Sequence, residues 1–435
     1  MKTGANKKLV VEGPIKIKGE VEISGAKNSA LPILAASILS KESIKLHNIP
    51  KLLDIISMLE VLSDLNTNIC LNDDDALIIN AEKAQSKNII EELTKKTRAS
   101  ILLLGPLLAR FKKATIALPG GCNIGKRPID MHINGLIAMG ANIQVKDNII
   151  YASCPNGLVG NTINLLKPSV GATENLIMAA SLAKGTTVLT NIALEPEIFD
   201  LIDFLNKMGA SIKQQGNIIE IQGSTKLKGC EHTIIGDRLE AGTYLIAATA
   251  TQGEVTTKNV NPDHLSFVLE KLSECGASIK TTRNSIHLSM QTQPKAVQIT
   301  TMPFPGFPTD LQAQWLTLNI IASGQSKVKE TIFENRISNV FELKKLGANL
   351  ELEQNEIKIK GNDSLIGNHV EAKDLRASAG LIIAGLTAQG KTHIHNTSYI
   401  DRGYVSLEEK LRKLGAIINR TQSIKENSIK TAEQT

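Results

Sequence analysis

The sequence predicts an α/β protein made of six similar units of about 70 residues, spread over two or more domains. A phrase of the kind Met-Gly-Ala-Asn-Ile recurs with its glycine at positions 140, 209, 276, 347 and 415, at spacings of 67 to 71 residues. A degenerate earlier copy runs from Leu65 to Ile69, in which Asn66 takes the place of glycine in a left-handed helix cap. The 435 residues are too many for one comfortable hydrophobic core, which predicts more than one domain.

Each unit contains an amphipathic helix that ends at the recurring glycine. Before Gly209, apolar residues from Ile198 to Met208 follow helical spacing, and the same spacing leads to Cys275. Cys275 is therefore expected to be a small apolar residue facing a core. After each glycine, alternating apolar and polar residues predict a strand, a turn such as 214–217 or 282–284, and a second strand.

A second recurring phrase predicts buried helices. Segments starting at 180, 248 and 384 each join an almost wholly apolar helix to a glycine-containing cap and a β-branched strand. A helix that is apolar on all sides must be buried on all sides. Three units could thus enclose three inner helices within a shell of sheets.

Composition excludes several classes of function. Aromatic residues make up only 3% of the chain, and the net charge of +6 is spread among interspersed acids and bases. These values suit a small anionic substrate better than nucleic acid. The five cysteines form no Cys-x-x-Cys pair and predict reduced thiols, and no apolar run reaches the length of a membrane span. We therefore expect a soluble cytoplasmic protein without structural zinc, nucleic acid or membrane as a partner.

The loop from Leu118 to Asp130 holds the first candidate for a reactive residue. Cys122 lies among glycines and shortly before Lys126 and Arg127, whose positive charges favour the thiolate. The alternative is a surface loop with an incidental cysteine. The loop also matches most of the phosphate-binding P-loop motif, but Arg127 occupies the position where a Ser or Thr hydroxyl must hold magnesium. An anion site is therefore plausible and an ATPase is not.

Two histidines could suggest a metal site. His393 and His395 lie two apart on a predicted strand and therefore point to one face. No third ligand is near them in the sequence, so no metal is expected.

Nine motifs in a fixed order resemble the enolpyruvyl transferase family over almost the whole chain, up to a polar tail from about Gln422. They are Ser24-Gly-Ala-Lys-Asn28, Arg98-Ala-Ser100, Pro119-Gly-Gly-Cys-Asn-Ile-Gly-Lys-Arg-Pro-Ile-Asp130, Pro168-Ser-Val-Gly-Ala-Thr173, Glu195-Pro-Glu197, Phe307-Pro-Thr-Asp-Leu-Gln312, Phe333-Glu-Asn-Arg336, Asp374-Leu-Arg-Ala-Ser378 and Asp401-Arg-Gly-Tyr404.

The resemblance implies a two-domain inverse α/β barrel, with three units in each domain, helices inside sheets and the active site between the domains. The first domain would span 27–235 and carry the cysteine loop, and the second would combine 1–26 with 236–435. The chain would then cross between the domains near Lys27 and near Gly236, and both crossings could serve as hinges.

The implied reaction transfers the enolpyruvyl group of phosphoenolpyruvate to the 3-hydroxyl of UDP-N-acetylglucosamine and releases phosphate. Such an addition needs an acid for the methylene carbon and a base for the hydroxyl. By resemblance, Cys122 is the acid and can form a covalent phospholactoyl adduct, Asp310 handles the sugar hydroxyl, and Lys27 and Arg402 also belong to the catalytic set. The implied substrate-binding residues are Lys27, Asn28, Arg98, Arg127, Pro128, Ile129, Asp130, Met131, Lys167, Ser169, Val170, Gly171, Asp310, Ile332, Arg336, Arg376 and Arg402.

Two alternatives to this activity remain, and a phosphate-release assay would distinguish them from it. The shikimate-pathway enolpyruvyl transferase shares the implied fold but lacks the cysteine loop, and an inactive relative would bind the UDP-sugar as a sensor. Beyond the adduct on Cys122, no cofactor is expected. A monomer is expected, although the sequence does not exclude an oligomer.

Overall fold

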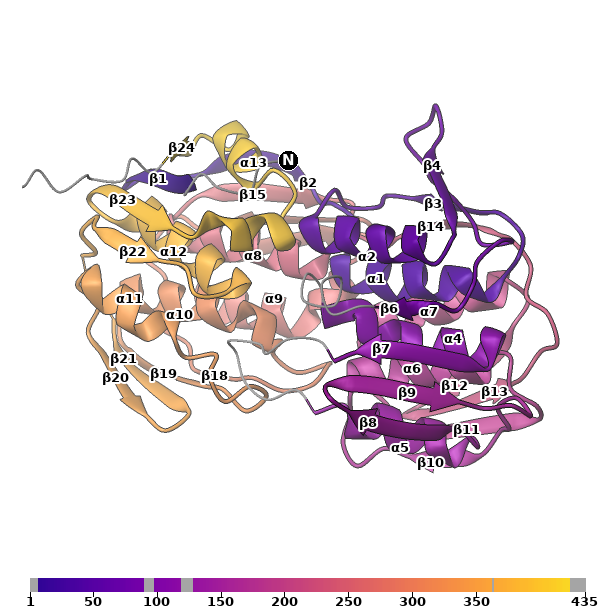
Figure 1. Cartoon of the computed structure of the whole chain (residues 1–435). Helices are drawn as coiled ribbons and strands as arrows, with labels where there is room; N and C mark the ends of the chain where they lie inside the picture. The colour runs from indigo at the N-terminus through magenta and orange to yellow at the C-terminus, as the bar shows by residue number, and fades with distance from the viewer. Residues whose placement is uncertain (1–6, 90–97, 119–127, 362–363, 423–435) are drawn as a thin grey trace, which may run out of the picture.

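The computed structural model of this chain describes residues 7–89, 98–118, 128–361 and 364–422. In this part of the chain the strands form six separate sheets of four strands, one for each predicted unit. Figure 1 shows two bodies, one built mainly from the indigo and magenta segments and the other from the later segments together with β1 (Lys7–Gly13) and β2 (Lys18–Glu22). The predicted α/β class is confirmed.

All six sheets share one pattern of strand directions, in which a parallel pair of strands is extended by an antiparallel pair, and in five of them this antiparallel pair is a hairpin. In one of them β10 runs parallel to β11, β11 pairs antiparallel with β13, and β13 pairs antiparallel with β12. The three sheets of the first body are β14-β3-β5-β4 (Glu231–Thr233, Ile44–His47, Leu77–Asn80, Asn68–Leu71), β6-β7-β9-β8 (Asn88–Ile89, Lys113–Ala117, Ile149–Ser153, Asn142–Lys146) and β10-β11-β13-β12 (Thr162–Asn164, Thr186–Thr190, Ile218–Gln222, Ser211–Gln215).

The second body draws two of its strands from the start of the chain. Strand β1 lies in the middle of one sheet and β2 lies at the edge of another. The three sheets are β22-β23-β1-β24 (His369–Glu371, Gly390–His395, Lys7–Gly13, Ile417–Gln422), β16-β17-β15-β2 (Ser278–Thr282, Ser285–Ser289, Glu254–Lys258, Lys18–Glu22) and β18-β19-β21-β20 (Ile299–Thr300, Gln325–Lys329, Glu356–Lys360, Leu350–Glu353). The hairpin turns predicted at 214–217 and 282–284 are confirmed.

Six amphipathic helices each end two residues before the repeated glycine or its asparagine. All five glycines have φ between +92° and +104°, and Asn66 has φ +68°, which confirms the predicted left-handed caps. Cys275 is fully buried and burial raises its pKa to about 12, as expected of a core residue. The helices are α2 (Leu53–Asp64), α5 (Asp130–Ala138), α7 (Pro196–Lys207), α9 (Ser266–Glu274), α11 (Asn339–Lys345) and α13 (Leu407–Lys413).

Six further helices are largely buried, as the second phrase predicted. Every residue of α8 is buried, and α8 packs against α10 and α12, while α4 packs against α6. The buried helices are α1 (Lys27–Ala36), α4 (Leu104–Phe111), α6 (Val170–Ala180), α8 (Arg238–Ala250), α10 (Gln312–Ile321) and α12 (Leu375–Thr387). None of the helices that the structure describes is long and apolar enough to cross a membrane.

The buried apolar residues fall into two clusters. One cluster extends from residue 30 to residue 234, and the other combines residues 9–23 with residues 239–418. The predicted domain limits near 27 and 236 stay a prediction, and this division supports them.

The two chain crossings lie side by side. Gly25 and Gly236 form an antiparallel bridge, and the Ala26 N–H donates to the Ile235 carbonyl at 2.7 Å. A Cβ on Gly25 would lie 1.7 Å from the Asn48 carbonyl oxygen, so this close approach requires glycine.

Candidate active site

Asp310 lies between two arginines in the second body. It belongs to the short helix η4 (Thr309–Leu311) that leads into α10, where Arg336 Nη1 donates to Oδ1 at 2.6 Å and Arg376 Nη2 donates to Oδ2 at 2.8 Å. Burial alone would raise the pKa of Asp310, but the two guanidinium groups outweigh it and hold the pKa well below its usual range. Asp310 is therefore a carboxylate at neutral pH.

A hydroxyl and amide network fixes Arg376. Its Nη1 donates to the Tyr404 hydroxyl at 3.2 Å, and the Gln314 side-chain amide donates to the same hydroxyl at 3.2 Å. Gln314 also donates to Thr243 at 3.0 Å, so helices α8, α10 and α12 are tied together beneath the arginine. Arg376 itself lies in the first turn of α12, whose N-terminus is capped by Asp374.

Lys27 opens α1 and contacts a carboxylate that the sequence did not single out. Its Nζ lies 3.3 Å from Asp54 Oδ2 in α2, and Arg402 Nε donates to Asp54 Oδ1 at 2.8 Å. Arg402 ends the short helix η5 (Thr397–Arg402) of the second body, so Asp54 joins cations from both bodies.

The two ion-pair clusters form one site. Burial lowers the pKa of Lys27, Asp54 and Asp310 act to raise it, and Arg376 and Arg402 act to lower it. Four cations thus face two carboxylates, since Lys27 and the three arginines gather around Asp54 and Asp310. A third carboxylate, Asp237, caps the N-terminus of α8, and burial raises its pKa. The surplus of positive charge suits an anionic ligand.

The two stretches predicted to bind the nucleotide come together at the starts of α5 and α6. Ser169 caps α6 by accepting from the Ala172 N–H, and a Cβ on Gly171 would lie 3.2 Å from the ring of His132 in α5. Helices α5 and α6 pack against each other, and the N-terminus of each carries the positive end of a helix dipole, which favours an anion. The predicted residues placed here are Pro128, Ile129, Asp130, Met131, Lys167, Ser169, Val170 and Gly171.

Other predicted residues are placed singly or lie outside the description. Asn28 follows Lys27 on α1 and is half-buried. Ile332 is partly exposed in the second body, where its N–H donates to Glu330 at 2.7 Å. Cys122 and Arg127 lie outside the described residues, as does the side chain of Arg98, which begins the short helix η2 (Arg98–Leu103). The roles predicted for these residues stay predictions.

Comparisons with known proteins identify the family. The profile of EPSP synthase (3-phosphoshikimate 1-carboxyvinyltransferase) matches residues 11–411. The chain belongs to the EPSP synthase family. It is 48% identical over 418 residues to a UDP-N-acetylglucosamine 1-carboxyvinyltransferase of Coxiella burnetii, covering 96% of both chains. A protein of that name from Actinobacillus succinogenes is 49% identical over 415 residues, covering 95% of this chain and 99% of the relative.

Solved structures of the family confirm the predicted fold. The enolpyruvyl transferase NikO from Streptomyces tendae superposes with a TM-score of 0.87 at 22% identity, covering 97% of this chain and 100% of that one. EPSP synthase from Acinetobacter baumannii superposes with a TM-score of 0.76 at 19% identity, covering 96% and 100%. At these identities the likeness extends to the fold alone.

Sequence reasoning missed several residues that this family member places in the site. Asp54 is the clearest, because it lies on the same buried stripe of α2 as Ile55, Met58 and Val61. A carboxylate on an apolar stripe was a readable signal, since charge is rarely buried without a partner. Tyr404 ends one of the nine motifs, but nothing in the sequence showed that its hydroxyl accepts a hydrogen bond from Arg376.

A third histidine joins the two that the sequence singled out. His369 stacks on His393 with ring centroids 4.3 Å apart, and its Nδ1 lies 3.2 Å from His395 Nε2. The sequence did not reveal this neighbour, which comes from the adjacent strand β22. Among the described residues, no group of three or more histidine, cysteine or acidic side chains is arranged to hold a metal ion.

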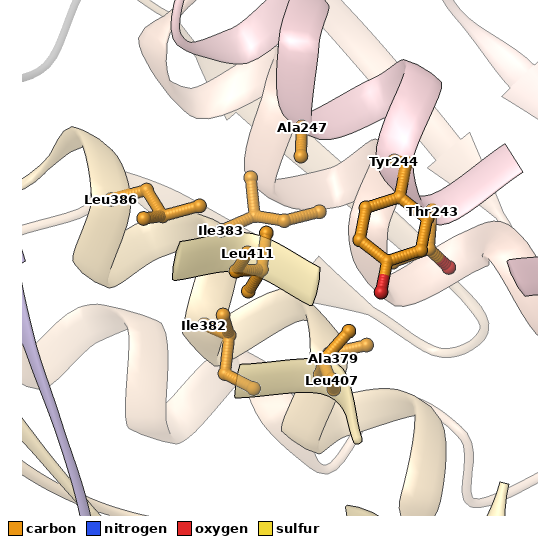
Figure 2. A pocket seen from close by; sticks show the side chains of 9 residues that line it. All are labelled: Thr243, Tyr244, Ala247, Ala379, Ile382, Ile383, Leu386, Leu407 and Leu411. Carbon is orange, nitrogen blue, oxygen red and sulfur yellow. The ribbon is translucent and has the colours of Figure 1, made fainter. Parts of the chain in front are cut away.

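The second body has two hollows whose linings do not include the residues predicted for the site. Figure 2 shows a cavity of about 10 Å³ among α8, α12 and α13, lined mainly by leucine, isoleucine and alanine with Thr243 and Tyr244, which is too small for a substrate. An open polar hollow of about 400 Å³ is lined by Ser338, Glu371, Ala372, Lys373, Asn396 and Tyr399. None of the predicted site residues lines either hollow, so the site is defined by its charges.

Proposed function

We propose that this protein transfers the enolpyruvyl group of phosphoenolpyruvate to the 3-hydroxyl of UDP-N-acetylglucosamine and releases phosphate, the first committed step of peptidoglycan synthesis. The observation that carries the proposal is the cluster of four cations, Lys27, Arg336, Arg376 and Arg402, around the carboxylates of Asp54 and Asp310. The name shared by relatives that are 48–49% identical over nearly the whole chain supports this choice of substrates.

The reaction requires an addition followed by an elimination. The sugar oxygen bonds to C2 of phosphoenolpyruvate while a proton goes to C3, and the double bond becomes a single bond. The phosphate then leaves C2 as a proton is lost from C3, which restores the double bond. Acid, base and anion contacts suffice for both steps, so the proposal needs no cofactor.

Asp310 and Cys122 would divide the proton transfers. Asp310 accepts the proton of the sugar hydroxyl, and Cys122 donates a proton to C3 and can form a covalent adduct with phosphoenolpyruvate. A carboxylate that is ion-paired with two arginines is a weak base, because its pKa lies well below the usual range. Phosphate and carboxylate oxygens of the substrate compete for Arg336 and Arg376, and this competition loosens their hold and makes Asp310 a better base.

The helix starts of α5 and α6 would hold the nucleotide. The diphosphate carries negative charge, and the positive dipole ends of the two helices, near Pro128 and Ser169, favour an anion. Arg127 and Lys167 add cations from the same two stretches. Both substrates are anionic metabolites, so we place the protein in the cytoplasm.

Phosphate release tests the proposal directly. Phosphate should appear only when phosphoenolpyruvate and UDP-N-acetylglucosamine are both present, and not when shikimate 3-phosphate replaces the sugar nucleotide. Release with shikimate 3-phosphate would assign the chain to the other activity of the family. Binding of UDP-N-acetylglucosamine without phosphate release would favour a sensor.

A further inference from the structure

We propose that Asp54 is a positioning residue for this reaction, because its carboxylate orients Lys27 and Arg402 and joins the two bodies at the site. The proposal rests on the proposed function. Asp54 Oδ2 lies 3.3 Å from Lys27 Nζ, and Asp54 Oδ1 accepts from Arg402 Nε at 2.8 Å. Helix α2 packs against both α1 and η5, which brings the three side chains together.

The folding of α2 does not call for a carboxylate at this position. Asp54 lies in the first turn on the buried stripe, and its side chain is only 8% exposed. Burying a carboxylate is unfavourable unless it is paired, whereas an apolar residue would extend the stripe at no such cost. Both Asp54 oxygens are engaged by cations that the reaction is proposed to use, so the residue serves the site.

Asp54 keeps Lys27 charged. The Lys27 side chain is 12% exposed, and burial is the largest cause that lowers its pKa. Among the charges that face Lys27, Asp54 is the strongest that raises its pKa, ahead of Asp310, while Arg376 and Arg402 lower it. The Lys27 backbone N–H is also 3.4 Å from Asp237. Without Asp54, the lysine would lose its proton at a lower pH and could no longer neutralise a phosphate.

Asp54 also orders Arg402. This arginine stands at the end of a short helix and its side chain is 40% exposed, so by itself it has many accessible rotamers. The contact with a buried carboxylate of the other body selects one direction for the guanidinium group. Because Lys27 belongs to the first body and Arg402 to the second, the carboxylate places both cations only when the bodies are together.

The kinetic test compares Asp54→Asn with Asp54→Glu. Phosphate release is measured at saturating UDP-N-acetylglucosamine over a range of phosphoenolpyruvate concentrations and pH values. For Asp54→Asn we expect kcat to fall about tenfold or more, and the basic limb of the kcat profile to move down by about one pH unit. We expect KM for phosphoenolpyruvate to change by less than about threefold, since losing one negative charge offsets the poorer placement of the cations.

The conservative variant separates charge from shape. Asp54→Glu keeps the charge but moves the carboxylate by one methylene group, so the basic limb should stay in place while kcat falls. Asp64→Asn is the matched control, because Asp64 is an exposed aspartate at the other end of α2, and it should behave like the wild type. An Asp54→Asn enzyme with an unmoved basic limb would overturn the proposal.

A measurement without turnover distinguishes this proposal from the proposed function. The lysines are labelled with acetic anhydride at a series of pH values, and the extent of labelling at Lys27 is read by peptide mass spectrometry. Lys27 should become reactive at lower pH in Asp54→Asn than in the wild type or Asp64→Asn, and equal reactivity would overturn the inference.

If the wild type releases no phosphate, the proposed function fails while this comparison still decides the role of Asp54. If Asp54→Asn does not fold, Asp54→Glu decides, because unchanged kcat would show that the exact place of the carboxylate is immaterial.

Discussion

Replacing Asp310 by asparagine should damage both turnover and stability. The substitution keeps the shape but removes the charge from between Arg336 and Arg376, whose side chains are 6% and 3% exposed. Breaking a buried ion pair costs about 3–5 kcal/mol. Asp310 remains 21% exposed and asparagine keeps part of the hydrogen bonding. We therefore expect Asp310→Asn to lower the free energy of unfolding by about 2 kcal/mol. For a domain of this size that corresponds to a fall of roughly 4–8 °C in the unfolding midpoint.

The dependence on pH provides a second check of the same ion pairs. The folded-state pKa of Asp310 is depressed, so its contribution to stability is complete above the unfolded pKa of about 4 and is lost as the pH falls through the folded value. The difference in midpoint between the wild type and Asp310→Asn should therefore be constant at neutral pH and shrink below about pH 4. Scanning calorimetry over this range measures it.

Turnover and a matched control complete the experiment. We expect kcat of Asp310→Asn to fall about a hundredfold or more, the range typical of losing a general base, with UDP-N-acetylglucosamine still bound. Asp263→Asn is the control, because Asp263 is an exposed aspartate in the comparable short helix η3 (Pro262–Leu265). Near-normal turnover would refute the base assignment, and an unchanged midpoint would refute the ion-pair reasoning.

Three further predictions concern thiols, tyrosines and domain closure. Fosfomycin, an epoxide resembling phosphoenolpyruvate, should alkylate Cys122 in the presence of UDP-N-acetylglucosamine and spare Cys230 and Cys275, where burial raises the pKa to about 11 and about 12. Peptide mass spectrometry showing another modified cysteine would contradict this. Tyr244→Phe should leave the urea-unfolding midpoint unchanged or raise it, because the Tyr244 hydroxyl is buried without a partner among the described residues. Tyr404→Phe should lower the free energy of unfolding in urea by about 1–3 kcal/mol, because it removes the hydroxyl that contacts Arg376. Equal effects of the two substitutions would contradict the hydrogen-bond pattern. UDP-N-acetylglucosamine should reduce the radius of gyration in solution scattering, and an unchanged radius at saturation would indicate a preformed cleft.

The repeats made the fold readable because each unit carries its own local signals. Asn66 could be assigned to a left-handed cap from its place in the repeat, and the structure has it at φ +68°. Cys275 could be assigned to a core from helical spacing alone. These features are set by residues of the same helix and its cap, where sequence spacing fixes geometry, and the repeat marks where each helix ends.

Contacts between distant segments were not readable in the same way. Asp54 and Arg402 are 348 positions apart, and no local spacing links an aspartate in a helix to an arginine in another body. The same holds for Tyr404, whose hydroxyl meets Thr243 and Gln314 only after three helices have packed. The resemblance supplied Lys27, Asp310 and the arginines, but residues that support them are visible only in the folded chain.

The place of β1 in the middle of a sheet sets an order for folding during synthesis. Its residue Leu9 pairs with Ile394 on one side and with Arg420 on the other, so its partners leave the ribosome long after β1 itself. The first hydrophobic cluster ends at residue 234 and can form while the rest of the chain is being made. The second body must hold its opening strand unpaired until β23 has emerged, and unpaired on one side until β24 has emerged. Loss of β24 would therefore expose β1 as a sheet edge, so damage at one end of the chain would reach the strand at the other.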